Sequence, residues 1–398
     1  MEPRRPVVYK PHNEPEVDFE INEASPEPAS EISPDKTMKK SFKNKFRPKL
    51  PQTKKGWAVV AVIVVLILGL VLYFASSGTP PKKKNVIAVL RTKTVPKSDL
   101  VPSTLSGLPV APSVNKIPVT GVMIENSVQA RPQSGLSSAG VVFEALAEGG
   151  ITRFLALYQD TAPSNVGPVR SARPYFVSWD MGFDAAYAHV GGSPDGLNDI
   201  SAWGTKDLNE FYNGAFYHRI SSRVAPHNVY TSIANLNQLE ANKGYTSTNF
   251  TGFPRKTATP AAKPSVSTIN ITMSGPDYNV SYAYNPKTNS YMRSEGGAPH
   301  IDANNNQQIS PTVVVAIVVP ETQGALDASG AYYSDYNVLS SGTAYVFQDG
   351  ILTTGQWAKT SNSSQITFTT SGGQPLKFDP GQTWITAITS PSQLTYGQ

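Results

Sequence analysis

The sequence feature that most constrains this chain is an uncharged apolar run at residues 57–75, which follows a long polar segment. The run has 19 residues. As a helix it would span about 30 Å, the thickness of the hydrocarbon core of a bilayer. A cleaved signal peptide has a shorter apolar region close to the N-terminus. The run therefore predicts a transmembrane helix, with membrane lipid as the partner of that helix.

The charges beside this run predict its orientation. Six Lys and Arg side chains lie just before it, between residues 43 and 55, whereas three lysines at 82–84 lie equally close after it. Positive charge collects on the cytoplasmic side of membrane spans. We therefore expect a single-pass protein of the cell membrane, with its N-terminus in the cytoplasm and its C-terminal domains outside.

Composition excludes several classes of protein. With 39% hydrophobic and 16% charged residues, the chain is neither disordered throughout nor fibrous. It has no cysteine, which excludes disulfides, thiol catalysis, Cys-based zinc sites and lipidation at an N-terminal Cys. Residues 1–56 hold 12 Lys and Arg against 9 Asp and Glu, so most of the formal net charge of +5 comes from this segment. The remainder is nearly neutral, and nucleic acid is not indicated as a partner.

The remaining segments predict an α+β fold in a membrane-anchored ectodomain. Residues 1–56 are Pro-rich, with acidic side chains first and basic ones later, and predict a disordered cytoplasmic tail. The basic half either contacts anionic lipid or only determines topology. The other segments are a stalk at 76–104, an α/β N-terminal domain at 105–253, a linker at 254–265 within FPRKTATPAAKPS, and a mainly β C-terminal domain at 266–398.

The N-terminal domain contains a strand, a Gly-rich turn and a helix in succession. Apolar runs at 141–147 and 151–159 predict a strand hairpin, and Pro174 is tolerable only in the first turn of the helix that follows. A strand is expected at 185–190. After it, Gly192 precedes Ser193, which is a good N-cap for a helix reaching about residue 203.

The start of that helix is a candidate anion site. Glycines let the backbone approach a ligand, and the free amides of a helix N-terminus favour negative charge. Arg153, Arg170 and Arg173 lie next to neighbouring turns, so we expect them to converge with His189 around Gly192 and Ser193. The alternative is that each arginine forms a structural ion pair. The candidate partners for such pairs are Glu144, Glu148, Asp180 and Asp184.

A second polar cluster lies at residues 217–229 and includes Arg223 and His227. His227 either orients a ligand and serves as an acid or base, or is held by backbone groups in a loop. The five histidines show no spacing typical of metal ligands, so no metal is predicted, and no cofactor is predicted either. Neither a phosphate-binding loop nor a nucleophile elbow is present in the sequence.

The C-terminal domain has six runs that predict strands: 268–273, 279–284, 312–319, 344–348, 365–370 and 383–388. Asp349-Gly350 and Gly372-Gly373 indicate turns between them. Trp357 and Trp384 are expected to anchor the core.

Several ordered motifs resemble the YerB-like lipoproteins, which have paired N- and C-terminal domains of unknown function. They are GVMIENSVQARPQSGLSSAGVVFEALAEGGITRFLALYQ, GPVRSARPYF, AAYAHVGGSP, RVAPHNVYTS, SYMRSEGGAPHID and GTAYVFQDGILTTGQWAKTS, and they cover most of 105–390. The lipidated Cys of that family is missing, and Glu125 and Pro174 replace an Asp of the family pattern. The resemblance implies a location in the cell envelope but implies no reaction.

A fainter likeness is to the LytR-CpsA-Psr envelope phosphotransferases. Arg153, Arg170 or Arg173, and the stretch 186–192 are similar to their pattern, which implies arginines that neutralise a polyprenyl diphosphate or a polymer-linked phosphate. Pro174 stands where those enzymes have an acid. We therefore favour a non-catalytic module that binds an anionic cell-wall or polyprenyl-phosphate ligand, with envelope phosphotransferase as the alternative. The sequence leaves the oligomeric state open.

Overall fold

The computed structural model describes residues 99–327 and 330–398, which lie in one compact unit, Leu90–Gln398. The predicted tail, the predicted transmembrane helix at 57–75 and most of the predicted stalk lie outside the described residues. Within the described ranges, no helix has the length and apolar character needed to cross a membrane.

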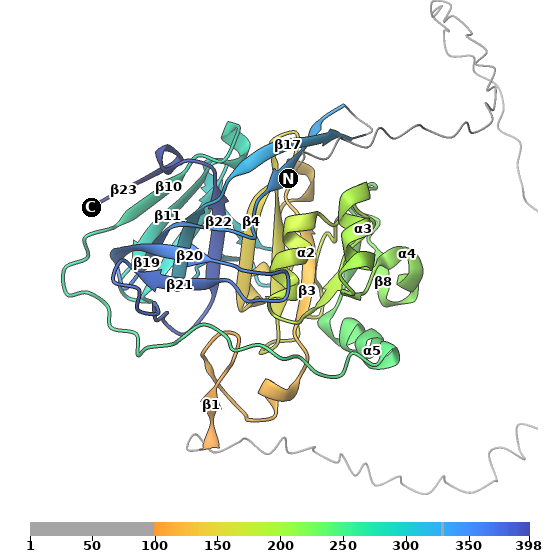
Figure 1. The fold of residues 1–398 in the computed structure, drawn as a ribbon, viewed down its shortest axis with the longest axis horizontal. Helices are drawn as coiled ribbons and strands as arrows, with labels where there is room; N and C mark the ends of the chain where they lie inside the picture. The colour runs from red at the N-terminus through yellow and green to blue at the C-terminus, as the bar shows by residue number, and fades with distance from the viewer. Residues whose placement is uncertain (1–98, 328–329) are drawn as a thin grey trace, which may run out of the picture. The chain divides into compact units, whose positions relative to one another are not determined.

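A 12-stranded sheet organises the structure and draws strands from both predicted domains (Figure 1). Its main path runs β21-β20-β19-β16-β22-β4-β5-β3-β6-β7, and the hairpin β17–β18 joins it at β4. The first group of strands is β3 (Thr120–Glu125), β4 (Val141–Glu148), β5 (Ile151–Tyr158), β6 (Ala186–Ala188) and β7 (Lys206–Asp207). The second group is β16 (Val313–Val318), β17 (Glu321–Leu326), β18 (Tyr332–Tyr336), β19 (Ser341–Gln348), β20 (Ile351–Ala358), β21 (Thr367–Thr370) and β22 (Thr383–Ile388). The two groups meet where β22 pairs in parallel with β4.

A second sheet has five strands, in the order β13-β12-β11-β10-β23. These are β13 (Ala298–Pro299), β12 (Ser290–Glu295), β11 (Val280–Asn285), β10 (Thr268–Ile271) and β23 (Leu394–Gly397). Three two-stranded ribbons are β1 (Val101–Pro102) with β2 (Pro109–Val110), β8 (Tyr217–Arg219) with β9 (Val229–Thr231), and β14 (Ile301–Asp302) with β15 (Gln307–Gln308). The α-helices of the described residues are α2 (Pro174–Met181), α3 (Pro194–Ala202), α4 (Glu210–Asn213) and α5 (Ile233–Lys243).

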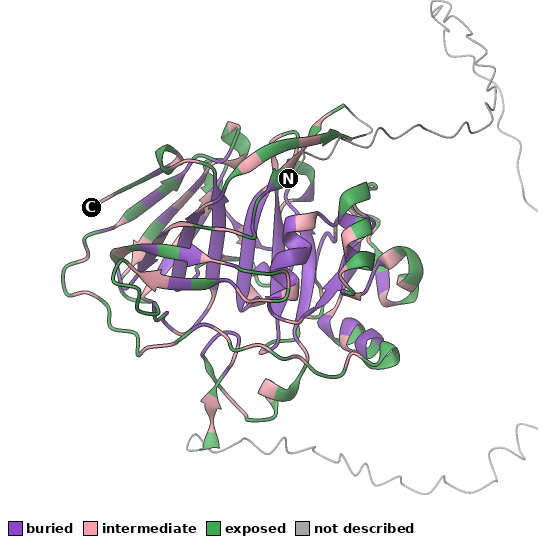
Figure 2. Ribbon diagram, in the orientation of Figure 1, coloured by how far each residue is buried: buried purple, intermediate pink, exposed green. Residues whose placement is uncertain are grey.

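The central strands β3, β4, β5, β16 and β22 are covered on both faces, so nearly all of their residues are buried rather than every second one. On one face Phe143 of β4 packs against α2, where its ring stacks on Trp179 with centroids 4.9 Å apart. On the other face Val142 belongs to a cluster that includes Ile269 of the second sheet and Leu236 of α5. Figure 2 shows the resulting band of buried strands through the middle of the described part.

Most local predictions are confirmed. β4 and β5 form the expected hairpin through Gly149 and Gly150, both with positive φ. Pro174 occupies the first turn of α2, and the Ser193 Oγ accepts a hydrogen bond from the amide of Gly196 at the start of α3. Each of the six strands expected after residue 266 is present, which makes this part mainly β.

The segment 254–265, expected to be a linker, forms contacts with residues far away in the chain. The Lys256 Nζ forms ion pairs with Asp349 and Asp379, and the Arg255 guanidinium donates to the carbonyls of Leu105 and Asp379. These partners lie about a hundred residues away in the chain, so the local composition could not indicate them. Residues 254–265 therefore form a connector that is bound to the folded part on both sides, rather than a linker without contacts.

Candidate functional site

Three arginines and two glutamates gather at one end of the central sheet, and we call them the arginine cluster: Arg153, Arg170, Arg173, Glu125 and Glu148. Glu125 ends β3, Glu148 ends β4, and Arg153 lies near the start of β5. Because β5 is antiparallel to both neighbours, its beginning lies beside their ends, and Arg153 is directly opposite Glu125 in the register. Arg170 and Arg173 come from the segment that enters α2.

Glu148 holds two of the arginines. Its Oε1 lies 2.6 Å from the Arg153 Nη2, and its Oε2 lies 2.5 Å from the Arg173 Nη2. Burial alone would raise the pKa of Glu148, but Arg153 and Arg173 outweigh burial and lower it. The Arg173 guanidinium also lies over the ring of Tyr333, 4.7 Å from its centroid. Arg153 and Arg173 are therefore fixed, and both are almost fully buried.

Arg170 is placed differently. Its Nε lies 3.5 Å from the Glu125 Oε1, and its guanidinium forms no hydrogen bond with any residue in the described part of the chain. The side chain is 25% exposed. Burial lowers the pKa of Arg170, with Glu125 raising it and Arg153 lowering it again. Three guanidinium groups thus face two carboxylates, and the donors of Arg170 remain available.

Glu125 also orients His227. The Glu125 Oε1 lies 2.9 Å from the His227 Nδ1 and accepts a hydrogen bond of 2.9 Å from the Ser127 Oγ. The imidazole is 19% exposed, and no described residue forms a hydrogen bond with its Nε2. A carboxylate on Nδ1 fixes the ring and leaves the second nitrogen free for a ligand. The alternative prediction was that backbone groups in a loop hold His227. In the structure a carboxylate side chain holds it instead.

Two other residues of the predicted site, His189 and Arg223, form hydrogen bonds outside the arginine cluster. His189 is buried, with its Nε2 2.9 Å from the Asp207 carboxylate and its Nδ1 2.7 Å from the Gly191 carbonyl. Arg223 donates to the carbonyls of Ala130 and Pro132 and to the Tyr230 hydroxyl. The expected convergence of His189 with the arginines is therefore not observed, because the Asp207 carboxylate binds its ring.

Gly192 and Ser193 lie beside the arginine cluster but contribute to the helix start. Gly192 forms a parallel bridge with Ala172, which precedes Arg173, and Ser193 caps α3. Arg173 and Ser193 both line a hollow of about 440 Å³ whose other charged side chains are acidic: Asp195, Asp199 and Asp335. Burial raises the pKa of Asp199, and the neighbouring Asp195 and Asp335 raise it further. An anion would be repelled here, so Arg170 offers the better contact.

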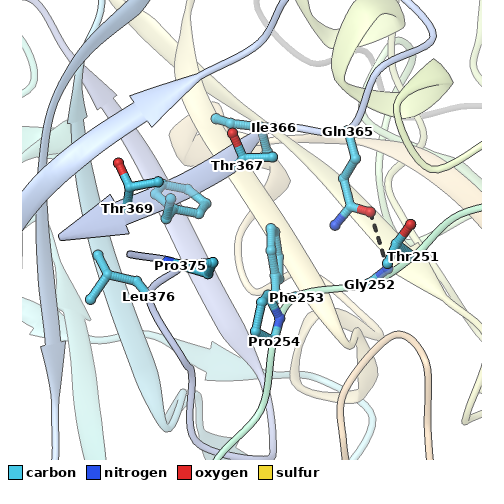
Figure 3. Close-up of a pocket in the computed structure, with 11 residues that line it drawn as sticks. Thr251, Gly252, Phe253, Pro254, Gln365, Ile366, Thr367, Thr369, Pro375 and Leu376 are labelled. Atoms are coloured by element: carbon cyan, nitrogen blue, oxygen red, sulfur yellow. Dashed lines mark hydrogen bonds between the residues drawn. The ribbon is translucent and has the colours of Figure 1, made fainter. Parts of the chain in front are cut away.

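A larger hollow, of about 520 Å³, lies between the connector and β21 (Figure 3). Phe253, Phe368 and Leu376 contribute to its apolar lining, and Gln365 accepts a hydrogen bond from the amide of Gly252 at its rim. No charged side chain lines it. This hollow cannot neutralise an anion. In the described ranges no group of His, Cys, Asp and Glu could hold a metal ion.

Reasoning from the sequence missed two members of this site, Glu125 and Ser127. Glu125 was noted only as a departure from a family pattern, within the string MIEN. Glu148 was one of several possible partners for the arginines, and the structure selects it for Arg153 and Arg173. Tyr333 could not be placed, because it belongs to a strand that joins β4 from the other half of the chain.

Both halves of the described chain match a known protein family. Residues 105–246 match the N-terminal domain, and residues 269–385 the C-terminal domain, of a protein family of unknown function, DUF3048. The chain is 33% identical over 304 residues to the protein named "Putative lipoprotein YerB" from Bacillus subtilis (strain 168), across 73% of this chain and 89% of that relative.

A solved structure agrees with these matches. The crystal structure of the YerB protein from Bacillus subtilis superposes with a TM-score of 0.67 at 30% sequence identity, and the match covers 75% of this chain and 100% of that one. The resemblance predicted from the sequence motifs is thereby confirmed, including the pairing of an N-terminal with a C-terminal domain.

Proposed function

This chain belongs to the DUF3048 family of YerB-like proteins, and from that premise we propose that it binds an anionic ligand of the cell envelope at Arg170. The ligand class is a lipid-linked or polymer-linked phosphate. The name of the Bacillus relative, a lipoprotein, supports a membrane-associated site outside the cytoplasm. In this chain, which has no cysteine to lipidate, the apolar run at 57–75 is the proposed anchor, with the N-terminus in the cytoplasm.

One observation carries the proposal. The Arg170 guanidinium is three-quarters buried, yet its one partner among the described residues is the Glu125 carboxylate, 3.5 Å from its buried Nε, and its two terminal nitrogens have no acceptor there. A buried charged donor without an acceptor is costly, because it has lost water without replacing it. A phosphate oxygen supplies such an acceptor, and the planar fork of an arginine matches two of them at once.

The charge balance supports the same ligand. Arg153 and Arg173 share the Glu148 carboxylate, and Arg170 shares Glu125 with His227, so positive charge exceeds negative charge by one in the arginine cluster. Partial burial strengthens the attraction for an anion, since the effective dielectric constant is below that of water. Pro174 stands where the envelope phosphotransferases have an acid, so binding is favoured over envelope phosphotransfer.

The test is a binding titration of the purified full chain in detergent with oligomeric glycerol phosphate, a soluble polymer phosphate. Arg170→Ala should weaken binding by about 10- to 100-fold, the loss of one charge-assisted contact worth ~1.5–3 kcal/mol. Lys287→Ala is the control, since Lys287 is an exposed cation in the turn between β11 and β12, outside the arginine cluster. Equal affinity of Arg170→Ala and the unmodified chain would contradict the proposal.

Vesicles distinguish the two sources of phosphate. Phosphatidylcholine vesicles with and without a polyprenyl phosphate present the lipid-linked form, whereas the oligomer presents the polymer-linked form. Preference for doped vesicles over the oligomer identifies a lipid-linked ligand, and the reverse preference identifies a polymer. In either case Arg170→Ala should weaken binding by the same factor.

A further inference from the structure

The imidazole of His227 has the arrangement of an acid–base group rather than that of a binding residue alone. Its Nδ1 lies against the buried Glu125 carboxylate at 2.9 Å, which fixes the orientation of the ring, while its Nε2 has no partner among the residues described. The same Glu125 oxygen lies 3.5 Å from the Arg170 Nε. One carboxylate therefore places a free imidazole nitrogen and an unused guanidinium side by side.

We propose that this site hydrolyses phosphate esters, with His227 as the general base and acid, Arg170 as the group that binds the phosphate, and Glu125 as the positioning residue. The proposal rests on the proposed function, because it needs the phosphate at Arg170. It goes beyond binding, since it assigns a reaction and the residue that carries the proton.

The step balances with water as the only co-reactant. The His227 Nε2 takes a proton from a water molecule, and the water oxygen forms a bond to phosphorus. The bond between phosphorus and the leaving oxygen breaks on the opposite side of the phosphorus, and the imidazolium Nε2 returns its proton to that oxygen through solvent water. Glu125 stabilises the imidazolium between the two transfers, and Arg170 stabilises the charge on the phosphoryl oxygens.

Water, rather than a protein hydroxyl, is the nucleophile that the geometry favours. The Ser127 Oγ is the nearest hydroxyl, 3.3 Å from the His227 Nδ1. That nitrogen already faces Glu125, and Ser127 itself bonds to the same carboxylate oxygen at 2.9 Å. Ser127 therefore cannot be deprotonated by the free Nε2, and it acts with Glu125 in holding the ring.

The test measures hydrolysis of p-nitrophenyl phosphate and of bis(p-nitrophenyl) phosphate by the purified full chain. His227→Gln should lower kcat by about 100-fold with little change in KM, as expected for a proton-transfer group. Arg170→Ala should instead raise KM. His218→Gln is the matched control, because His218 is an exposed histidine of the neighbouring strand β8, outside the site, and should keep full activity.

A pH profile separates a chemical role from a structural one. A general base must be neutral, so kcat/KM of the unmodified chain should fall at acidic pH, and this acid limb should be absent from the residual activity of His227→Gln. Glu125→Gln should retain the fold and lose activity, because a neutral amide does not stabilise the imidazolium. A circular dichroism melt of each variant checks folding.

The two proposals fail in different ways. If the unmodified chain binds oligomeric glycerol phosphate through Arg170 but hydrolyses neither ester, hydrolysis is overturned and binding stands. If it hydrolyses the esters with the same kcat in His227→Gln, the assignment of His227 is overturned. If it neither binds nor hydrolyses, the proposed function fails and the reaction fails with it.

Discussion

Two groups of arginines and glutamates contact the same central sheet, yet they differ in how far they are exposed to solvent. The arginine cluster has been described above. The second group, the Arg293 network, consists of Arg293, Glu144, Glu295, His300 and Trp384. The Arg293 Nη2 lies 2.7 Å from the Glu144 Oε1 and its Nη1 lies 3.4 Å from the Glu295 Oε2, with all three side chains almost completely buried.

The Arg293 network is closed. The Glu144 Oε2 accepts hydrogen bonds from the Trp384 Nε1 at 2.8 Å and from the Thr386 Oγ1 at 3.2 Å. Burial lowers the pKa of Arg293, but Glu144 and Glu295 outweigh burial and raise it above its ordinary value. Burial lowers the pKa of His300, as does the neighbouring Arg293, so this histidine stays neutral.

The difference teaches that residue type does not separate a structural ion network from a binding site. Glu144 of β4, Arg293 of β12 and Trp384 of β22 join strands from both family domains. The one unmatched donor of Arg293, its Nε, is fully buried and therefore out of reach of a ligand. In the arginine cluster Arg170 keeps its donors and one quarter of its surface. Exposure and unmatched donors make that distinction.

The largest effect is expected at Arg293. Arg293→Met should lower the free energy of unfolding by about 3–5 kcal/mol, because it leaves the buried Glu144 without its cation and leaves Glu295 with Arg131 alone. Urea unfolding of the full chain measures this. The double variant with Glu144→Gln should recover part of the loss. A loss below ~1 kcal/mol would mean that the network is not closed as described.

Glu148→Gln should have the second-largest effect on stability. It should lower the free energy of unfolding by about 1–3 kcal/mol at neutral pH, since Arg153 and Arg173 lose their shared partner. The folded-state pKa of Glu148 is lowered, so its contribution is present above its ordinary pKa and disappears as the pH falls through the lowered value. Unfolding curves of the two proteins should therefore converge in acid. Parallel curves at all pH values would show that the carboxylate charge is not responsible.

Another buried glutamate, Glu240, has no arginine as its partner, so its pKa shifts in the opposite direction to that of Glu148. The Glu240 Oε1 accepts a hydrogen bond of 2.6 Å from the Thr120 Oγ1, and its Oε2 has no partner. Burial raises the pKa of Glu240 to about 7. The folded state thus binds the extra proton between the ordinary value and about 7, and stability falls as the pH rises through that range.

Glu240→Gln should therefore stabilise the fold at pH ~8 by about 1–2 kcal/mol and have little effect at pH ~4. Thermal melts across this range measure the difference. Destabilisation by Glu240→Gln at the higher pH would indicate that the charged carboxylate has a partner after all.

The smallest effect on stability is expected at Arg170. Arg170→Ala removes no hydrogen bond to a described residue, and Glu125 keeps Ser127 and His227. The free energy of unfolding should change by less than about 1 kcal/mol. The same urea measurement used for Arg293 checks it. A loss as large as that of Arg293→Met would remove the distinction between the two groups.

Local chemistry explains which features the sequence could predict. Strand β4, the turn at Gly149 and Gly150, and the Ser193 cap of α3 depend on near neighbours in the chain, and all are present. The strands after residue 266 are recognisable by their Thr, Val and Ile runs for the same reason.

Pairings between distant segments explain which features could not be predicted from the sequence. Nothing near Lys256 indicates Asp349 or Asp379, and nothing near Glu144 indicates Arg293. The arginines of the candidate site were found because charged side chains beside turns stand out, whereas Glu125 did not, since it ends an apolar strand. His189 stood out equally, and only the position of Asp207 shows that its ring is occupied.

The place of β22 in the central sheet has a consequence for the time course of folding. β22 lies between β16 and β4, although it is the last strand of that sheet to be synthesised, and Trp384 contacts Glu144, which lies 240 positions earlier in the chain. Contacts so distant in sequence slow folding, because a long loop must close before they form. A ribosome must therefore release nearly the whole chain before β4, already paired with β5, gains β22 on its other side, and until then that open edge of β4 can pair with the wrong strand.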